Sequence, residues 1–270
     1  MPLAVCATPI GNLADITLRV LEELRSADLV LCEDTRRTRV LLTRHGVEAR
    51  LLSYHQHNEA ARVAELLPRL AAGERMALVS DAGLPGVNDP GARLVAASIA
   101  AGVPVTVLPG ASAVETALVA SGFVGDQYRF VGYLPRKAND LAALWQDVIS
   151  RPYPVVAFES PRRIGASLAS LAELAPDRPV AVCRELTKVF EEVVRGTAVE
   201  LADRFSDPAR GEITVVVGGS QEVAQAPDDE AAAAVAVAQL VAVGTPRRVA
   251  VDVVARIAGV PRNQLYRSSL

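Results

Sequence analysis

Short apolar runs alternate with helix-length segments along most of this chain of 270 residues. In the first part of the chain, the apolar runs span residues 3–7, 29–32, 51–54, 77–79 and 105–108. The segments between them, such as residues 17–26 and 59–72, carry the apolar spacing of amphipathic helices. Strands and helices of these lengths in alternation indicate βαβ units. We therefore expect an α/β fold with a largely parallel sheet.

Most of the predicted strands end in a loop of small, polar or acidic residues. These loops span residues 8–12, 33–36, 80–91 and 109–113. Because the carboxyl ends of parallel strands lie at one edge of a sheet, ligands commonly bind there. A single loop of this kind can also be a turn that needs Gly, Pro and Asp for its backbone angles. Their combination at one edge favours a ligand site.

The charge of the loop at residues 80–91 restricts the ligand. The loop contains Asp81 and Asp89 but no lysine or arginine. Phosphate-binding loops use backbone amides together with Lys, Ser or Thr, so a cationic or hydroxyl-rich ligand fits better. Asp81 can accept hydrogen bonds from an amine or a ribose, or pair with a sulfonium. Its alternative role is to cap the following helix.

Backbone groups at the same edge are further candidates. Gly11, Gly83 and Gly110 would let the backbone approach a ligand closely, although turn geometry alone can require glycine. Ser112 and Ala113 begin a predicted helix, whose free amide groups can bond a ligand. The alternative is that Ser112 is a simple helix cap.

A second set of strands follows the first, and a helical segment follows that. The strands are expected within residues 130–135, 155–158, 180–183 and 213–217, which gives predicted domains at residues 1–120 and 121–220. Residues 221–270 are expected to form a linker at about residues 221–229, an Ala-rich helix capped by Asp228 or Asp229, and a helical pair at 249–258 and 262–266. The pair resembles a helix-turn-helix, but such pairs are also ordinary packing units.

Composition narrows the class of protein. The formal net charge of -3 argues against wholesale binding of polyanions, so contact with nucleic acid needs a local basic patch. Cys6, Cys32 and Cys183 lie in apolar runs without disulfide or metal spacing, and we expect them in the core of a protein from a reducing compartment. Neither a signal peptide nor a membrane span is predicted, which favours a cytoplasmic location.

Histidines and arginines give two further expectations. His55 and His57 stand close together without a third ligand at metal-site spacing, so we expect no metal. Basic clusters occur at Arg36-Arg37-Arg39, Arg136-Lys137, Arg162-Arg163 and Arg247-Arg248. The first three lie at the predicted ligand edge, where they favour a polyanionic substrate held by its phosphates. Aromatic residues, at 4%, are too few for a broad base-stacking platform.

Several motifs, taken in order, resemble one family. They are Thr8-Pro9-Ile10-Gly11-Asn12-Leu13, Glu33-Asp34-Thr35-Arg36, Ser80-Asp81-Ala82-Gly83, Asp89-Pro90-Gly91, Pro109-Gly110, Phe158-Glu159-Ser160-Pro161-Arg162-Arg163 and Arg184-Glu185-Leu186-Thr187-Lys188. From these motifs the chain is identified as a member of the bacterial small-subunit ribosomal RNA methyltransferase I family. The resemblance covers almost the whole chain, including Gly259-Val260-Pro261 and Leu265-Tyr266.

The resemblance implies a fold, a cofactor and a reaction. The fold is that of the tetrapyrrole methylases, with two α/β domains, S-adenosylmethionine in the cleft between them, and usually a homodimer. The reaction is methyl transfer to the ribose 2′-oxygen of a cytidine in the 16S ribosomal RNA of the small subunit. Charge is neutralised in this transfer, so no metal is expected. By position in that fold, the cofactor-lining residues are Gly11, Asp81, Leu84, Ser112, Ala113, Phe158, Glu185 and Glu212.

A ribose hydroxyl is a poor nucleophile, so a proton acceptor within reach would help. We hypothesise that Glu33, Asp34, Arg36 and Lys188 frame the reacting ribose, with one carboxylate, or a lysine of lowered pKa, as the base. The alternative for Arg36 is a structural ion pair with Asp34 or Glu33.

The chain departs from the family pattern at Arg37, Arg162 and Phe190, where we expect His, and at Leu84, where we expect Thr. These departures leave open any role of those histidines in RNA contact or proton transfer. Two other functions stay open as well. One is a methylase of tetrapyrroles or other small molecules on the same fold. The other is a nucleic-acid-binding regulator whose α/β body senses a ligand.

Overall fold

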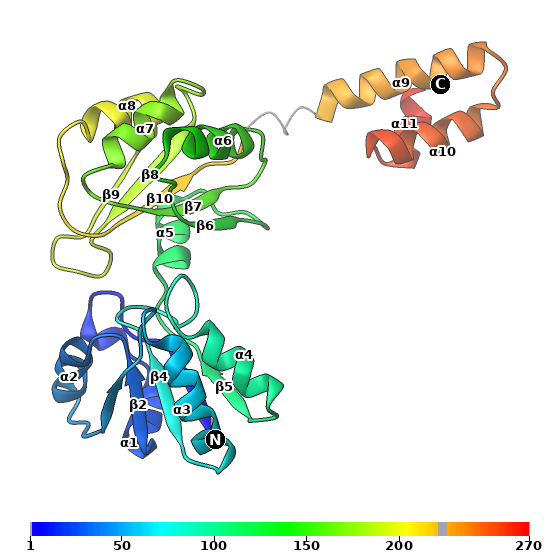
Figure 1. Cartoon of the computed structure of the whole chain (residues 1–270). Coiled ribbons are helices and arrows are strands. Elements are labelled where there is room, and N and C mark those ends of the chain that lie inside the picture. The colour runs from blue at the N-terminus through cyan, green and yellow to red at the C-terminus, as the bar shows by residue number, and fades with distance from the viewer. Residues whose placement is uncertain (1, 221–225, 270) are drawn as a thin grey trace. The chain divides into compact units, whose positions relative to one another are not determined.

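The computed structural model describes residues 2–220 and 226–269. The chain divides into two compact units, Met1–Gly219 and Ser220–Leu270. The first unit contains two five-stranded sheets, and the second contains helices α9 to α11 (Figure 1).

The first sheet is parallel throughout and has the strand order β3-β2-β4-β1-β5. Its strands are β1 (Leu3–Cys6), β2 (Leu29–Cys32), β3 (Leu51–Ser53), β4 (Met76–Val79) and β5 (Val105–Leu108). The parallel sheet expected from the alternation of strands and helices is confirmed.

Helices cover both faces of this sheet, α1 and α2 on one and α3 and α4 on the other (Figure 1). In β1, Ala4 and Cys6 pack on the side of α1 and α2, whereas Leu3 and Val5 pack on the side of α3 and α4. Because both faces are buried, the strands are continuously apolar. The helical segments are η1 (Leu13–Asp15), α1 (Leu18–Ser26), α2 (Thr35–Arg44), α3 (Glu59–Ala71) and α4 (Ala92–Ala100).

The second sheet is mixed and has the order β6-β7-β10-β8-β9. β6 and β7 are parallel, and the other neighbours are antiparallel. The strands are β6 (Arg129–Tyr133), β7 (Val155–Glu159), β8 (Pro179–Arg184), β9 (Glu192–Thr197) and β10 (Ile213–Val217).

The two faces of the second sheet are covered by different helices. α6 (Ala138–Ile149), α7 (Ile164–Ala172) and α8 (Ala198–Arg204) share one apolar cluster with the sheet, centred on the buried Trp145. Helix α5 (Ala113–Ser121) covers the opposite face, although it follows the first sheet in sequence. It therefore links the edge of the first sheet to the second sheet.

The C-terminal unit consists of α9 (Ala226–Ala242), α10 (Arg247–Ala258) and α11 (Arg262–Ser268), which share one apolar cluster. Gly259, with φ of 68°, ends α10 in the left-handed conformation that favours glycine. Since α9 begins at Ala226, the predicted capping by Asp228 or Asp229 is wrong, and the linker predicted for residues 226–229 is helical instead. The rest of that predicted linker, residues 221–225, lies outside the described residues.

Two smaller expectations concern the core and membranes. Cys6, Cys32 and Cys183 are all buried and unpaired, as predicted for core residues. Among the helices of residues 2–220 and 226–269, none is long and apolar enough to cross a membrane.

Candidate functional site

The loops that follow β1 and β4 are tied together at the carboxyl edge of the first sheet. The amide of Thr8 donates to the carbonyl oxygen of Gly83 at 2.8 Å, and the amide of Gly83 donates back at 3.0 Å. The buried hydroxyl of Thr8 donates to the carbonyl oxygen of Ser80 at 3.0 Å. These contacts fix the start of the acidic loop relative to β1.

A loop of the second sheet reaches the same edge. The amide of Asn12 donates to Oγ1 of Thr187 at 2.9 Å. A Cβ atom on Gly11 would lie 2.5 Å from Cγ of Lys188 and 2.9 Å from the carbonyl oxygen of Leu186, so only glycine allows this approach. Gly11 thus explains how the two loops meet.

The other two candidate glycines differ from each other. A Cβ atom on Gly110 would lie 2.8 Å from Cβ of Ala7, so Gly110 permits close packing of two strand ends. Gly83 has φ of +78°, and the nearest atoms would lie 3.8 Å from its Cβ. Its backbone conformation, rather than lack of space, requires glycine.

Asp81 joins the loop after β4 to the loop after β2. Its Oδ1 accepts a hydrogen bond from the amide of Asp34 at 3.1 Å, and its Oδ2 accepts one from Arg37 at 3.3 Å. Gly91, not Asp81, is the N-cap of α4. The alternative reading of Asp81 as a cap for the following helix is therefore wrong. Each carboxylate oxygen retains a lone pair for a ligand.

Asp34 is engaged by its own helix. Its Oδ1 accepts from the amide of Arg36 at 2.8 Å, and its two oxygens receive Nε and NH2 of Arg36 at 3.1 and 2.8 Å. These bonds lower the pKa of Asp34 to about 2, chiefly through the Arg36 side chain. The structural pairing considered for Arg36 is present, and Asp34 is a weak base.

Glu33 and Asp89 have the opposite electrostatic environment. Burial, with Asp81 next, raises the pKa of Glu33 above its usual range. Burial, followed by the charges of Glu33 and Asp81, raises the pKa of Asp89 to about 6. No described residue donates a hydrogen bond to the Glu33 carboxylate. Glu33 is therefore the predicted catalytic carboxylate best able to accept a proton.

Asp89 was missed as a site residue, although its Asp-Pro-Gly motif was recognised. Its importance depends on neighbours from other strand ends, which no local pattern reveals. The signal available in the sequence was a second carboxylate in a loop that already contained Asp81.

Lys188 lies between two carboxylates. Its Nζ donates to Glu185 Oε1 at 2.8 Å and to Glu212 Oε2 at 2.7 Å. Partial burial alone would lower the pKa of Lys188, but these two bonds outweigh burial and raise it. The expectation of a lysine with a lowered pKa is wrong, because this ammonium holds its proton more tightly than usual.

Glu185 and Glu212, both predicted to line the cofactor, lie close together in the structure. Their hydrogen bonds, however, join the two segments to each other. Glu185 also accepts a hydrogen bond from the Glu212 amide at 2.9 Å. The Lys188 bond, with this amide bond second, lowers the pKa of Glu185. With φ of 53°, Glu185 adopts a conformation that is strained for a residue with a side chain.

The start of α5 and the second sheet supply an apolar side to the site. Ala113 and Phe158 lie in one cluster with Ile10 and Ala82, which come from the loops of the first sheet. Ser112 is the N-cap of α5 but makes no capping bond, and its hydroxyl donates to Glu115. The amides of Ala113 and Val114 are thus left without a capping bond from Ser112, whereas the Glu115 amide bonds its own carboxylate.

Leu84 packs elsewhere, in the cluster that includes α3 and α4. The structure therefore does not bring Leu84 into the apolar cluster of Ala113 and Phe158. Phe190 also carries an apolar side chain where the family pattern has a polar residue, and it is exposed.

The basic side chains near the carboxyl ends of the strands are of two kinds: some bind other residues, and some have no partner among the described residues. Arg37 bonds Asp81, and Arg163 bonds the carbonyl oxygens of Leu134 and Pro135. By contrast, Arg136, Lys137 and Arg162 are exposed, and no described residue pairs with their side chains.

The histidines do not assemble a metal site. Within residues 2–220 and 226–269, no group of three or more His, Cys, Asp or Glu could hold a metal ion. Nε2 of His55 lies 3.3 Å from Nδ2 of Asn58, and the rings of His55 and His57 are 5.9 Å apart. His45 bonds the carbonyl oxygen of Leu13.

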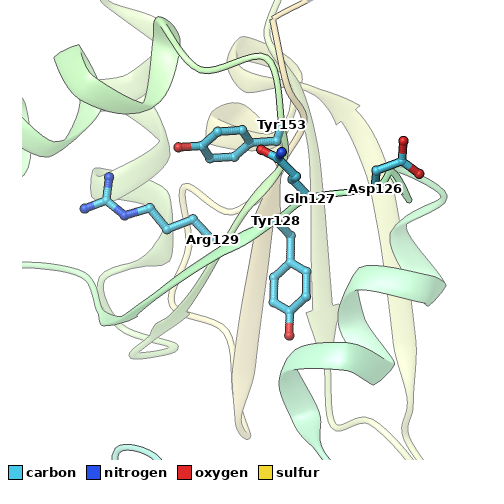
Figure 2. Close-up of a pocket in the computed structure, with 5 residues that line it drawn as sticks. All are labelled: Asp126, Gln127, Tyr128, Arg129 and Tyr153. Atoms are coloured by element: carbon cyan, nitrogen blue, oxygen red, sulfur yellow. The ribbon is translucent and has the colours of Figure 1, made fainter.

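A separate hollow of about 520 Å³ lies where β6 and β7 begin, opposite to their carboxyl ends. Figure 2 shows its five lining residues: Asp126, Gln127, Tyr128, Arg129 and Tyr153. Arg129 pairs with Asp147, and the Tyr128 hydroxyl donates to Glu115 at 2.6 Å. None of the predicted site residues lines this hollow.

Comparison with known proteins identifies the relatives of the chain. Residues 2–202 match the family described as Tetrapyrrole (Corrin/Porphyrin) Methylases. The chain is 48% identical to Ribosomal RNA small subunit methyltransferase I of Micromonospora olivasterospora, covering 98% of this chain and 85% of the relative. It is 39% identical to the protein of the same name from Neisseria meningitidis serogroup B, covering 99% and 92%.

Solved structures share the fold. Uroporphyrin-III C-methyl transferase from Thermus thermophilus, complexed with S-adenyl homocysteine, superposes with a TM-score of 0.55 at 20% identity, over 80% of this chain and 96% of that chain. The tetrapyrrole-methylase fold expected from the motifs is confirmed. The chain therefore belongs to the tetrapyrrole methylase family and, within it, to the ribosomal RNA small subunit methyltransferase I proteins.

Proposed function

We propose that this chain transfers a methyl group from S-adenosylmethionine to the ribose 2′-oxygen of a cytidine in 16S ribosomal RNA. The observation that carries the proposal is the 48% identity to a ribosomal RNA small subunit methyltransferase I over 98% of the chain. The demethylated donor bound in the related Thermus thermophilus enzyme supports the choice of methyl donor.

The chemistry of the residues at the edge fits this donor. S-adenosylmethionine supplies an electrophilic methyl group on a cationic sulfonium. Glu33, Asp81 and Asp89 form a partly buried acidic group that would stabilise such a cation. The uncapped amides at the start of α5 can donate to a carboxylate or to a ribose oxygen. The apolar surface around Ala113 and Phe158 suits a purine ring.

We propose Glu33 as the acceptor of the 2′-hydroxyl proton. Its raised pKa and lack of a hydrogen-bond donor among the described residues distinguish it from Asp34, which Arg36 holds ionised. Methyl transfer otherwise depends on alignment of oxygen, carbon and sulfur, which is a positioning task. Arg36 acts indirectly in this proposal, by fixing Asp34 at the start of α2.

The other predicted site residues have separate roles in the proposed reaction. Gly11, Asp81, Ser112, Ala113 and Phe158 would line the donor. Glu185 and Glu212 hold Lys188, which leaves Lys188 as a fixed cation beside the loop of Gly11. Leu84 would act only through the backbone of its loop, since its side chain packs towards α3 and α4.

The RNA would approach along the free cations Arg136, Lys137 and Arg162, whose charges suit phosphates. We also propose a homodimer and a cytoplasmic location, both supported by the family resemblance. Light scattering of the purified chain tests the dimer.

The proposed reaction is tested by incubating the chain with labelled S-adenosylmethionine and unmodified small ribosomal subunits. Label is expected in 16S RNA, in a 2′-O-methylated cytidine located by mapping. A parallel incubation offers a tetrapyrrole, because several proteins of this fold act on such rings. Label on the tetrapyrrole and none in RNA would contradict the proposal and support the small-molecule alternative.

A further inference from the structure

We infer that Tyr133 is a stacking surface for one base of the RNA substrate, with Arg136, Lys137 and Arg162 holding the neighbouring phosphates. This inference deepens the proposed function and rests on it. It assigns a substrate-contacting residue at the end of β6, outside the residues that were predicted to bind the donor or to act on the ribose.

The backbone of β6 turns Tyr133 away from the sheet core. The pairing of β6 with β7 shifts register between Phe130 and Tyr133. Gly132 lies within this irregularity and has φ of 72°. Bulges of this kind re-aim a side chain and are common beside active sites. The outcome is an aromatic ring that is 64% exposed, although it belongs to a strand.

The ring is supported by an aromatic neighbour. Phe158 makes an edge contact with Tyr133, with ring centres 5.5 Å apart, and Phe158 makes a second edge contact with Phe130 at 5.0 Å. Both phenylalanines are half-buried in the apolar cluster under the site. Tyr133 is thus held in place by its edge contact while much of its surface stays open to a partner.

The first sheet also approaches Tyr133. A Cβ atom on Gly132 would lie 3.0 Å from Oδ1 of Asn88, which belongs to the acidic loop. Burial, then the carboxylates of Glu212, Asp89 and Glu159, raises the pKa of Tyr133, so its hydroxyl stays neutral. Tyr133 therefore lies near the acidic loop and within the electrostatic influence of Asp89, one of the carboxylates that we assign to the donor site.

Free cations lie on the two loops that follow β6 and β7. Arg136 and Lys137 come three and four residues after Tyr133, and Arg162 comes four residues after Phe158. Arg163 ties these loops together through its bonds to Leu134 and Pro135. An exposed aromatic ring together with unpaired cations is the arrangement by which proteins bind single-stranded nucleic acid. Because Tyr133 is the exposed ring within residues 130–137 and 158–163, we assign one base to it.

The experiment compares Tyr133→Leu and Tyr133→Phe in methylation of unmodified small subunits. Tyr133→Leu is expected to raise KM for the subunit about 10-fold, since base stacking on an aromatic ring contributes to affinity on this order. Tyr133→Phe keeps the ring and is expected to stay within about twofold of the unsubstituted chain. The dissociation constant for S-adenosylmethionine is expected to be unchanged in both.

Tyr153→Leu is the matched control, because Tyr153 precedes β7 at the opposite end of the same strand pair (Figure 2). It is expected to leave KM unchanged. An unchanged KM in Tyr133→Leu would overturn the inference. So would an equal loss of S-adenosylmethionine affinity, because the ring would then contact the donor. If the unsubstituted chain fails to label RNA, the proposed function itself is contradicted.

Discussion

Carboxylates that are neighbours at the strand ends differ widely in proton affinity. Arg36 holds the pKa of Asp34 at about 2, whereas burial and neighbouring carboxylates raise that of Asp89 to about 6. Sites that separate pKa values in this way can assign acid and base roles to similar side chains. Sequence patterns indicated Asp34 as a candidate and missed Asp89, because the raised pKa of Asp89 depends on burial and on Glu33, which comes from another strand end.

Substitution Glu33→Gln tests the assigned base. Loss of the proton acceptor is expected to lower kcat about 100-fold, in the range for general base catalysis, with S-adenosylmethionine affinity nearly unchanged. Single-turnover methylation and equilibrium binding measure the two quantities. Asp34→Asn is the matched control and is expected to lower kcat less, because Asn also caps helices. A larger loss in Asp34→Asn than in Glu33→Gln would contradict the assignment.

Substitution Asp89→Asn tests whether the buried negative charge of Asp89 destabilises the folded chain. The pKa of Asp89 is 3.8 in its reference state and about 6 in the folded chain. The folded chain therefore binds this proton more tightly, so the free energy of unfolding falls as pH rises from about 4 to about 6.

The Asp89→Asn substitution removes this pH-dependent decrease in the free energy of unfolding. At pH 8 the variant is expected to be more stable by about 1 kcal/mol, a value reduced for solvent screening, and the gain is expected to disappear at pH 3. Urea denaturation at both pH values measures the difference. A variant that is less stable at pH 8 would show that the Asp89 charge is favourable.

Helix α7 approaches the end of α8 closely at a glycine, Gly165. A Cβ atom on Gly165 of α7 would lie 2.1 Å from the carbonyl oxygen of Phe205, just after α8. At the start of α3, a shared hydrogen-bond acceptor joins neighbouring segments. Oε1 of Glu59 accepts hydrogen bonds from the Tyr54 hydroxyl and the Gly91 amide, each at 3.0 Å, and so fixes the end of the acidic loop.

Substitution Gly165→Ala is expected to destabilise the chain by about 3 kcal/mol, since backbone atoms of α7 and α8 would have to separate. Gly122→Ala is the control. Gly122 ends α5 with φ of 79°, but no atom lies within 4 Å of its Cβ position. Its expected cost is about 1 kcal/mol, from backbone strain alone. Equal costs in thermal denaturation would contradict the packing argument.

Substitution Glu59→Ala is expected to lower the free energy of unfolding by about 2 kcal/mol, because it leaves the buried Tyr54 hydroxyl and the Gly91 amide without their acceptor. Tyr54→Phe removes only one donor and is expected to cost about 1 kcal/mol. Chemical denaturation of both single variants and the double variant checks this. Additive losses would contradict a shared network.

Sequence patterns predicted the first sheet well because its buried parallel strands are continuous apolar runs. They missed β9, which is half-buried and carries Glu192 and Arg195, and they missed α8. The Thr197 and Glu200 capping box at the start of α8 was the overlooked signal. Patterns along the chain also could not show that α5 packs on the second sheet, since that contact joins distant segments.

The whole chain divides into separate apolar cores. Four clusters contain only residues up to Val217, and the fifth contains only residues of α9 to α11 and the turns between them. The sequence from Ser220 to Leu270 carries five arginines and five acidic residues, so the C-terminal unit has no net charge. All five arginines lie in α10 and α11, where Asp252 is the one acidic residue. The C-terminal unit therefore has its own core, and its basic residues are confined to the helical pair that the regulator alternative would use.

Truncation after Gly219 tests the role of the C-terminal unit. Because no residue of the first unit's clusters is removed, the unfolding temperature of Met1–Gly219 is expected to stay within about 2 °C of the corresponding transition in the full chain. The affinity for S-adenosylmethionine is expected to be unchanged, since every proposed donor-lining residue remains.

Loss of the arginines is expected to raise KM for the small subunit severalfold at low salt, with the difference shrinking as salt increases. Calorimetry, donor binding and methylation at two salt concentrations measure these effects. Complete loss of methylation with intact donor binding would instead place an essential RNA contact in the C-terminal unit, and tight operator DNA binding by the full chain would support the regulator.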